Sequence, residues 1–468
     1  EASNIDIDDS GSRFQLARPA DRSYLKTRID ANRGISTQWQ TDLYLGDGME
    51  VFYSGASPRY VDGDNMGIFV LDGASTSDSA ITIEGGVLRV AHAEALGTTA
   101  GATEFNNGKL DLNGFDVGSE TLTTASWPGG NIGLLNSDMQ TTAIAGDVDI
   151  HYMFNKVPFR GPGDIRITGT LTGTHGGGSY WTKQGHGTLY VEGPVVNMRA
   201  PHWWNGAVVL DYRSDTGSKI LDSQTVELNG AGVTIIGNDG AAVTETVGDL
   251  DLTTGGRARG NNFVHVYAGN NQDATFSFGG LSRRWGMSLD FMAVDNGTGT
   301  ARIIGRGVAN TGDGILGPDY TYNRTSWAQV DADSNIVGMA DGEYSTTFVD
   351  GTHVDAPAGS STLASSMTIN TLRFNQNADA TVDLDTFNLT MKQSAPNANC
   401  GILVTPTVGA HDVSISGGGV LWYSGFNRPI IVHQHNTNGA LIIASRIADN
   451  INNGIVKTGS GELRLTND

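Results

Sequence analysis

The chain has 468 residues, 29 of them Lys or Arg and 50 of them Asp or Glu, which gives a net charge of −21. This acidic balance opposes binding to nucleic-acid phosphates and docking on anionic lipid, so we expect neither partner. A single cysteine, Cys400, excludes an intramolecular disulfide framework, and no run of about 18 apolar residues offers a transmembrane segment of the helical type.

Glycine is abundant, with 64 residues, but it follows no Gly-X-Y period, which excludes a collagen triple helix. Glycine tolerates the positive φ angles of tight turns, so this content suits many short strands joined by turns. We therefore expect a folded, all-β protein.

Residues 1–80 differ from the rest of the chain. They carry mixed charge, a candidate helical stretch at residues 20–33 and the polar turn Asp-Gly-Asp-Asn at residues 62–65. We interpret residues 1–80 as an N-terminal cap or assembly segment and residues 81–468 as a β-solenoid domain.

From residue 81 onward, short alternating strands dominate, as in ITIEGGVLRV at residues 81–90, and convincing helices are absent. Many short strands at this spacing form either a sandwich or barrel, or a parallel β-solenoid. The phrase KQGHGTLYV at residues 183–191 returns 274 residues later as KTGSGELRL at residues 457–465. Such long-range recurrence favours a solenoid with coils of roughly 20–25 residues.

These phrases resemble a known family. Residues 83–122 contain a strand, an Ala-Leu-Gly turn and a Leu-Asp-Leu-Asn-Gly strand, and the two recurring phrases contain Gly-x-Gly followed by an alternating strand. Together they resemble the autotransporter-associated β-strand repeat of passenger-type surface proteins, over roughly residues 80–468. The resemblance implies a right-handed parallel β-helix outside the cell, without enzymatic activity of its own in most members, and it supplies no catalytic residues to assign.

The sequence departs from the family pattern in two places. PVVNMRAPHWWNG replaces the usual strand after the first Gly-x-Gly phrase, which puts the coil around Trp203 and Trp204 in question. The chain also ends at Asp468, directly after the second phrase and with no translocating barrel. We therefore expect a mature product or a fragment without its own exporter.

Asp-x-Asp pairs on expected strands are candidate calcium ligands. Residues i and i+2 share one face of a strand, so each pair presents two carboxylates side by side. The alternatives are a solvated outer face and an acid–base pair for polysaccharide cleavage. The pairs are Asp6 and Asp8, Asp147 and Asp149, Asp249 and Asp251, and Asp383 and Asp385.

Aromatic and histidine side chains offer further candidates. Trp203 and Trp204 could stack on sugar rings, or they could form a packed seam or a subunit contact. His433 and His435 share a strand face and could bind zinc with a third ligand, although a hydrogen-bonded surface or ladder position fits the pattern better. Cys400 fits a small buried residue better than a nucleophile.

Three function classes follow. Our first expectation is an extracellular structural protein that assembles with itself head-to-tail, because the strand near Leu463 leaves an unpaired edge that the first 80 residues could complement. The alternative is a secreted adhesin or carbohydrate-binding passenger that presents a long lateral face to surface glycans. The third is a β-helix polysaccharide lyase or hydrolase. Apart from calcium, we expect no cofactor.

Overall fold

The computed structural model describes five strands before residue 68 and then most of the chain up to residue 467. Within this part, the residues outside the description are 77, 79, 84–85, 106–107, 125–132, 152–156, 174–178, 253–259, 284–285, 393–399, 425–428 and 449–453. The chain forms two compact units. Unit 1 comprises Glu1–Glu227 and Val233–Val247, and unit 2 comprises Leu228–Gly232 and Gly248–Asp468.

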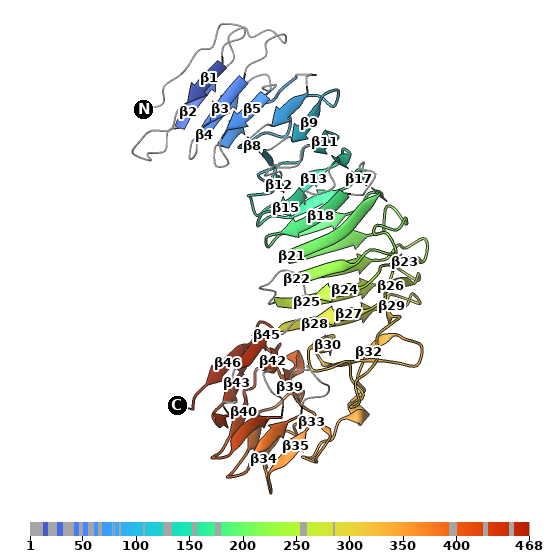
Figure 1. The fold of residues 1–468 in the computed structure, drawn as a ribbon, viewed down its shortest axis with the longest axis vertical. Helices are drawn as coiled ribbons and strands as arrows, with labels where there is room; N and C mark the ends of the chain where they lie inside the picture. The colour runs from blue at the N-terminus through green and yellow to red at the C-terminus, as the bar shows by residue number, and fades with distance from the viewer. Residues whose placement is uncertain are drawn as a thin grey trace. The chain divides into compact units, whose positions relative to one another are not determined.

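Unit 1 is a stack of parallel strands in which each sheet takes one strand from each coil (Figure 1). Sheet 1 contains β1 (Arg13–Leu16), β3 (Asp42–Leu45), β5 (Tyr60–Gly63), β7 (Ile81–Ile83), β9 (Ala102–Phe105), β11 (Thr121–Thr124), β14 (Val148–Ile150), β17 (Leu171–Gly173) and β20 (Val195–Val196). Sheet 2 contains β2 (Lys26–Asp30), β4 (Glu50–Ser54), β6 (Ile68–Leu71), β8 (Val87–Val90), β10 (Lys109–Asp111), β12 (Gly133–Leu135), β15 (Val157–Arg160), β18 (Ser179–Gln184) and β21 (Met198–Asp211).

A third sheet begins at β13 (Thr142–Ile144) and continues through β16 (Ile165–Ile167) and β19 (Thr188–Val191) into the second half of β21. The long β21 serves two sheets because Asn205 and Gly206 take positive φ angles of 66° and 73° and bend it between them. β22 (Val226–Ile236) and β23 (Val243–Thr246) follow in the sequence.

The coil length predicted from the sequence is confirmed in the middle of unit 1, whereas the first two coils of sheet 1 measure 29 and 18 residues. Leu88 pairs with Leu110 and Leu110 with Leu134, so equivalent residues are about 22–24 positions apart. These three leucines are all buried, because alternate side chains of each short strand point into the coil and stack on their equivalents. Each fully buried leucine contributes roughly 1.5–3 kcal/mol.

The strands before residue 80 belong to the same sheets. β5 pairs in parallel with β7, and β6 with β8, so sheets 1 and 2 cross residue 80 without a break. The helical stretch expected at residues 20–33 is wrong where the structure describes it, since residues 26–30 form β2 and pair with β4. Ladder hydrogen bonds of the stack override the local helical pattern there.

Unit 2 starts with parallel strands in the same style. β24 (Leu250–Leu252) pairs with β27 (Leu281–Arg283), β25 (Gly260–Tyr267) with β28 (Met287–Val294), and β26 (Ala274–Phe278) with β29 (Ala301–Gly305). β28 then pairs with β30 (Tyr320–Tyr322).

An antiparallel segment interrupts the stack. β30 pairs with β31 (Ser326–Val330), and β31 with β32 (Ile336–Gly338). Three residues connect β30 to β31, and the first two of them, Asn323 and Arg324, take left-handed φ angles of 53° and 58° in a tight turn. The sequence analysis did not anticipate this hairpin, because Asn-Arg lacks the glycine that usually marks such a turn.

A parallel β-helix with three sheets completes unit 2. Sheet 4 contains β33 (His353–Asp355), β36 (Thr371–Phe374), β39 (Cys400–Val404), β42 (Ile430–Gln434) and β45 (Ile455–Thr458). Sheet 5 contains β34 (Gly359–Thr362), β37 (Ala380–Asp383), β40 (Val413–Ser416), β43 (Ala440–Ile443) and β46 (Glu462–Leu465), and sheet 6 contains β35 (Met367–Ile369), β38 (Leu389–Met391), β41 (Val420–Tyr423) and β44 (Arg446–Ile447). In the described part of the chain the helices are two 3-10 turns, Asp341–Glu343 and Pro406–Val408, so the all-β expectation is confirmed.

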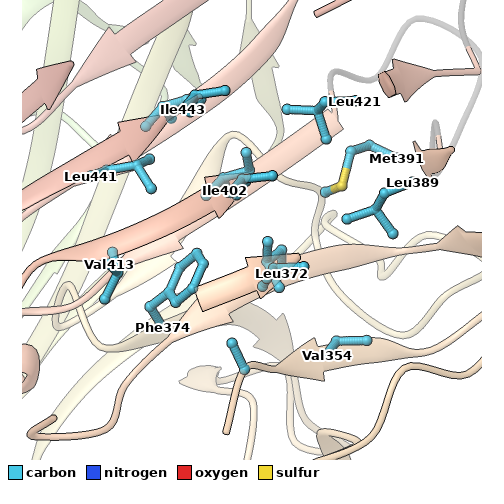
Figure 2. Packing of buried hydrophobic residues seen from close by; sticks show 14 of the residues in the cluster. Val354, Leu372, Phe374, Leu389, Met391, Ile402, Val413, Leu421, Leu441 and Ile443 are labelled. Atoms are coloured by element: carbon cyan, nitrogen blue, oxygen red, sulfur yellow. The ribbon is translucent and has the colours of Figure 1, made fainter. Parts of the chain in front are cut away.

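The core of this β-helix is a stack of aliphatic side chains. Figure 2 shows Leu372 and Ile402 from sheet 4, Leu441 from sheet 5 and Leu421 from sheet 6 converging on its centre. All four side chains are fully buried. The parallel β-helix predicted from the sequence is therefore present.

Sheet 4 is buried on both faces. Its outward-facing Leu403 packs in a second cluster with Trp327 of β31 and Tyr344. A side chain at Gly401 would collide with Pro318 and Trp327, so glycine permits this close approach. Burial on both faces explains why β39 reads as a continuous run without charged or polar alternation, and why all five residues of β42 are buried.

Candidate ligand pocket

A pocket of about 910 Å³ lies within unit 2, among the first residues of β25, the loop before β28, the β30–β31 turn, and β45 with the Gly-x-Gly turn that follows it. Its size is in the range of small-molecule sites. The polar side chains that line it are those of Asn261, Arg324, His435, Lys457, Thr458 and Ser460.

Arg324 reaches the pocket from the tight turn between β30 and β31. Its backbone N–H donates to Asp290 Oδ1 at 2.9 Å, which fixes the turn against β28. The Nε of Arg324 lies 3.7 Å from Asp290 Oδ2, which is a charge contact and too long for a good hydrogen bond. The Arg324 side chain is about half exposed, at 51%, while that of Asp290 is buried at 3%.

Lys457 reaches the pocket from β45. Its Nζ donates to the carbonyl oxygen of Gly459 at 2.7 Å, so the ammonium group is held beside the Gly-x-Gly turn. An ammonium carries three donors, and two of them are left for other acceptors. Partial burial lowers the pKa of Lys457 from its ordinary value.

His435 forms part of the pocket wall and is 7% exposed. Burial lowers the pKa of His435 to about 4; the charge of Asp290 opposes this shift, and those of Arg324 and Lys457 add to it. The imidazole is therefore neutral at pH 7. Its Nε2 is buried and makes no hydrogen bond to any residue that the structure describes.

A chain of hydrogen bonds fixes the pocket floor. Ser288 Oγ donates to Asn261 Oδ1 at 2.9 Å and lies 3.0 Å from Thr458 Oγ1. These contacts join β25 and β28, which pair with each other, to β45. β45 is far from both in the sequence but lies beside them in Figure 1. The pocket walls are thus set by packed strands, which preorganises the polar groups.

The described lining has two cationic side chains and no carboxylate. It is suited to holding an anionic group, with Arg324 and Lys457 as charge partners and amide and hydroxyl groups as neutral ones. Cleavage of a polysaccharide by paired carboxylic acids needs two carboxyl groups beside the bond, and the described lining supplies neither.

The predicted calcium pairs occupy other positions. Asp6 and Asp8 lie outside the described residues. In the described pairs, one carboxylate of each pair accepts a backbone N–H: Asp147 from Thr170 at 2.9 Å, Asp249 from Gly280, and Asp383 from Asp385 at 2.9 Å.

The first two of these bonds connect successive coils, which is a structural role. Asp251 similarly accepts from the Ser282 hydroxyl at 3.0 Å. Among the described residues, no group of three or more His, Cys, Asp or Glu side chains is placed to hold a metal ion. Calcium binding stays a prediction.

The two predicted aromatic contacts differ from each other. Trp203 is fully buried and packs edge-on against Trp181 at 5.5 Å, so its ring faces the core and not a ligand. Trp204 is partly buried. The coil that contains them continues the parallel stack, since Lys183 pairs with Trp203 and Leu189 with Val208, but its register shifts once between Tyr180 and Thr182. The packed seam is the alternative that this placement fits.

The remaining candidates are buried. Cys400 is fully buried, its Sγ lies 3.2 Å from the carbonyl oxygen of Met391, and burial raises its pKa to about 12, as expected for a packed residue. His433 and His435 were expected at a hydrogen-bonded surface or ladder position; both are buried, at 1% and 7% exposed, and His433 lies in the ladder of β42 between Leu403 and Thr458. The outer face of sheet 4 is covered by the chain around Pro318, whose carbonyl oxygen lies 2.8 Å from His433 Nε2.

Sequence reasoning missed the pocket because its residues come from segments far apart in the chain. Arg324 and Lys457 are separated by more than a hundred residues and meet only because the β-helix packs beside the hairpin. The available signal was the repeated Lys-x-Gly-x-Gly phrase, which located Lys457 at a turn but gave no reason to place Arg324 near it.

Comparison with known proteins supports the resemblance seen in the sequence. Over 421 residues, 86% of this chain, the sequence is 28% identical to the "Adhesin BmaC autotransporter" of Brucella suis biovar 1 (strain 1330). The chain is similar to passenger-type autotransporter surface proteins. It spans 11% of the length of that adhesin, so the two share one section of a much longer protein. No family model matches the chain, and no solved structure matches it.

Proposed function

We propose that this chain is the section of an autotransporter passenger that acts in adhesion, displayed at the cell surface or outside the cell. The observation that carries the proposal is the similarity to an autotransporter adhesin along 86% of the chain. The parallel β-helix supports it, because a stack of coils offers long lateral faces while its core stays closed.

The adhesin role is favoured over our first expectation, a head-to-tail filament. The observed similarity is to an adhesin, and no described contact bears on self-assembly. An enzymatic role has less support, because the pocket in unit 2 lacks carboxylates among its described lining residues. In the described part of the chain, no helix is long and apolar enough to cross a membrane.

The test is adhesion of coated beads. Fluorescent beads carrying the purified chain are applied to cultured epithelial cells, and bound beads are counted as the bead dose increases. We expect saturable binding that free chain competes away. Binding no greater than that of albumin-coated beads would contradict the proposal.

A folding control separates specific adhesion from adsorption. Gly187→Val places a side chain where even a Cβ would lie 2.0 Å from the carbonyl oxygen of Gly163, so it disrupts the stack. Beads with this variant should bind less than beads with the native chain. The same preparations, examined by analytical ultracentrifugation, test the filament: a monomer at all concentrations argues against head-to-tail assembly.

A further inference from the structure

We propose that the pocket in unit 2 binds a carboxylate-bearing sugar residue of an acidic glycan. This inference rests on the proposed function as an adhesin, and it names the class of ligand and the residues that recognise it. The argument starts from charge, then considers the neutral groups, and then the size of the site.

The two cations come from different elements. Arg324 lies in the β30–β31 turn and Lys457 in β45, and the charges of both act on the same neighbour, His435. The chain as a whole carries a charge of −21, yet the described lining of this pocket has two positive groups and no negative one. A local reversal of charge in an acidic protein selects an anion and steers it toward the pocket.

The nearby carboxylate of Asp290 holds Arg324 in place without being part of the pocket lining. Asp290 is buried behind Arg324 and receives the backbone N–H of Arg324 and the hydroxyl of Thr321, at 2.9 and 2.7 Å. The contact of Asp290 with the guanidinium is made at Nε, at 3.7 Å, and within the described part of the chain the terminal nitrogens of Arg324 remain for a bidentate bond to a carboxylate.

His435 adds a neutral donor. It is more than nine-tenths buried, lines the pocket and has an Nε2 without a hydrogen-bond partner among the described residues. A buried polar atom of this kind normally has a partner, so an unpartnered one in the wall of a pocket is a candidate for contact with a ligand or a water. The neutral imidazole can donate from Nε2 to a carboxylate or to a sugar hydroxyl.

The size and lining favour a sugar over a small inorganic anion. The volume of about 910 Å³ is far larger than one carboxylate or sulfate group needs. Asn261 and Ser460 add amide and hydroxyl groups to the lining. Several neutral hydrogen-bonding groups around one charged pair match a sugar acid, which carries one carboxylate and several hydroxyls.

The experiment compares acids with their neutral esters. Trisaccharides that end in glucuronate, galacturonate or sialic acid, and their methyl esters, are titrated into the full chain by calorimetry. We expect at least one acid to bind about tenfold or more tightly than its own ester. Arg324→Gln and Lys457→Gln should each lower that affinity by a similar factor, and His435→Gln should lower it less.

Arg464→Gln is the matched control. Arg464 lies on β46, the strand after β45, where it forms an ion pair with Glu462 at 2.7 Å, and it does not line the pocket. The substitution removes the same positive charge as Arg324→Gln. The affinity of the Arg464→Gln variant for the sugar acid should equal that of the native chain. Circular dichroism checks that each variant is folded.

Three results would overturn the inference: no acid binds, acid and ester bind equally, or Arg464→Gln weakens binding as much as Arg324→Gln. Tighter binding of tetraglutamate than of any sugar acid would assign the pocket to acidic peptides instead. Bead adhesion is measured in parallel. If Arg324→Gln loses sugar binding but beads coated with it still adhere, the pocket assignment holds and another face mediates adhesion. If beads coated with the native chain do not adhere, the proposed adhesin function is wrong, but the pocket assignment is not affected.

Discussion

Lys183 and Lys457, one in each unit, make the same bond. Lys183 Nζ donates to the carbonyl oxygen of Gly185 at 2.7 Å, and Lys457 Nζ donates to that of Gly459 at 2.7 Å. Gly185 and Gly459 have φ angles of 87° and 79°. The recurring sequence phrase therefore specifies one local structure, in which a lysine two residues earlier caps a left-handed glycine.

The second glycine of each phrase has a different task. A Cβ at Gly187 would lie 2.0 Å from the carbonyl oxygen of Gly163 in the coil before, and a Cβ at Gly461 would lie 2.0 Å from that of Asn436. We expect Gly187→Ala and Gly461→Ala each to reduce the free energy of unfolding by about 1–3 kcal/mol, measured by urea denaturation. Gly312→Ala is the control, since nothing lies within 4 Å of its Cβ position. Equal free energies of unfolding for all three variants would contradict the prediction, because they would show that neighbouring coils move apart at no cost to accommodate a Cβ.

Arg373 connects the C-terminal β-helix to the chain before it. Its Nη2 donates to Asp355 at 2.9 Å and to Asp341 at 2.8 Å, and its guanidinium lies 3.6 Å from the centre of the Tyr344 ring. The side chain is 2% exposed. Arg373→Met leaves Asp355 buried without its cation, so we expect a loss of about 3–5 kcal/mol in the free energy of unfolding.

The double variant Arg373→Met, Asp355→Leu tests the reason for that loss. It removes both buried charges, so it should be more stable than Arg373→Met alone. If the double variant is less stable than the single one, the unpaired carboxylate is not the cause. Both are measured by chemical denaturation at pH 7.

Glu245 organises the loop after β21 in unit 1. Its carboxylate accepts from the backbone N–H of Lys219 and Ile220 at 2.8 and 3.1 Å, and from the Ser218 hydroxyl at 3.1 Å. Glu245→Ala leaves the two backbone donors without an acceptor, whereas Ser218 can still donate to the carbonyl oxygen of Ile220 at 2.7 Å, so we expect a loss of about 2–4 kcal/mol and faster proteolysis within residues 213–225. Glu245→Gln retains one acceptor oxygen and should lose less. Limited trypsin digestion followed by mass spectrometry locates the cuts.

The sequence predicts this fold well where side chains repeat and poorly where the chain leaves the repeat. Leu88, Leu110 and Leu134 follow the coil period, and their stacking could be foreseen. Trp327 and Leu403 contact each other because the hairpin at Asn323 and Arg324 interrupts the stack, and no period encodes that contact. The same holds for the pocket: Lys457 lies in a recognisable phrase, while Arg324 is a single residue in a turn without the usual glycine.

Two buried histidines make the protein sensitive to acid. Burial lowers the pKa of His433 to about 3 and that of His435 to about 4, from an ordinary 6.5. Because both folded values lie below the unfolded one, the stability contributed by the neutral rings is present above pH 6.5. It is lost as the pH falls below 6.5 toward 4, since only the unfolded chain takes up these protons.

We expect His435→Asn to reduce this acid sensitivity. Between pH 7.5 and pH 5.0, each histidine lowers the free energy of unfolding by roughly 2 kcal/mol, so the variant should lose about that much less than the native chain. Carboxylates also titrate in this range, but they are common to both proteins and cancel in the comparison. His186→Asn, which makes the same substitution at an exposed site, is the matched control. Urea denaturation in carboxylate-free buffers gives the values, and an equal drop in native chain and His435→Asn would mean that His435 is protonated in the folded state.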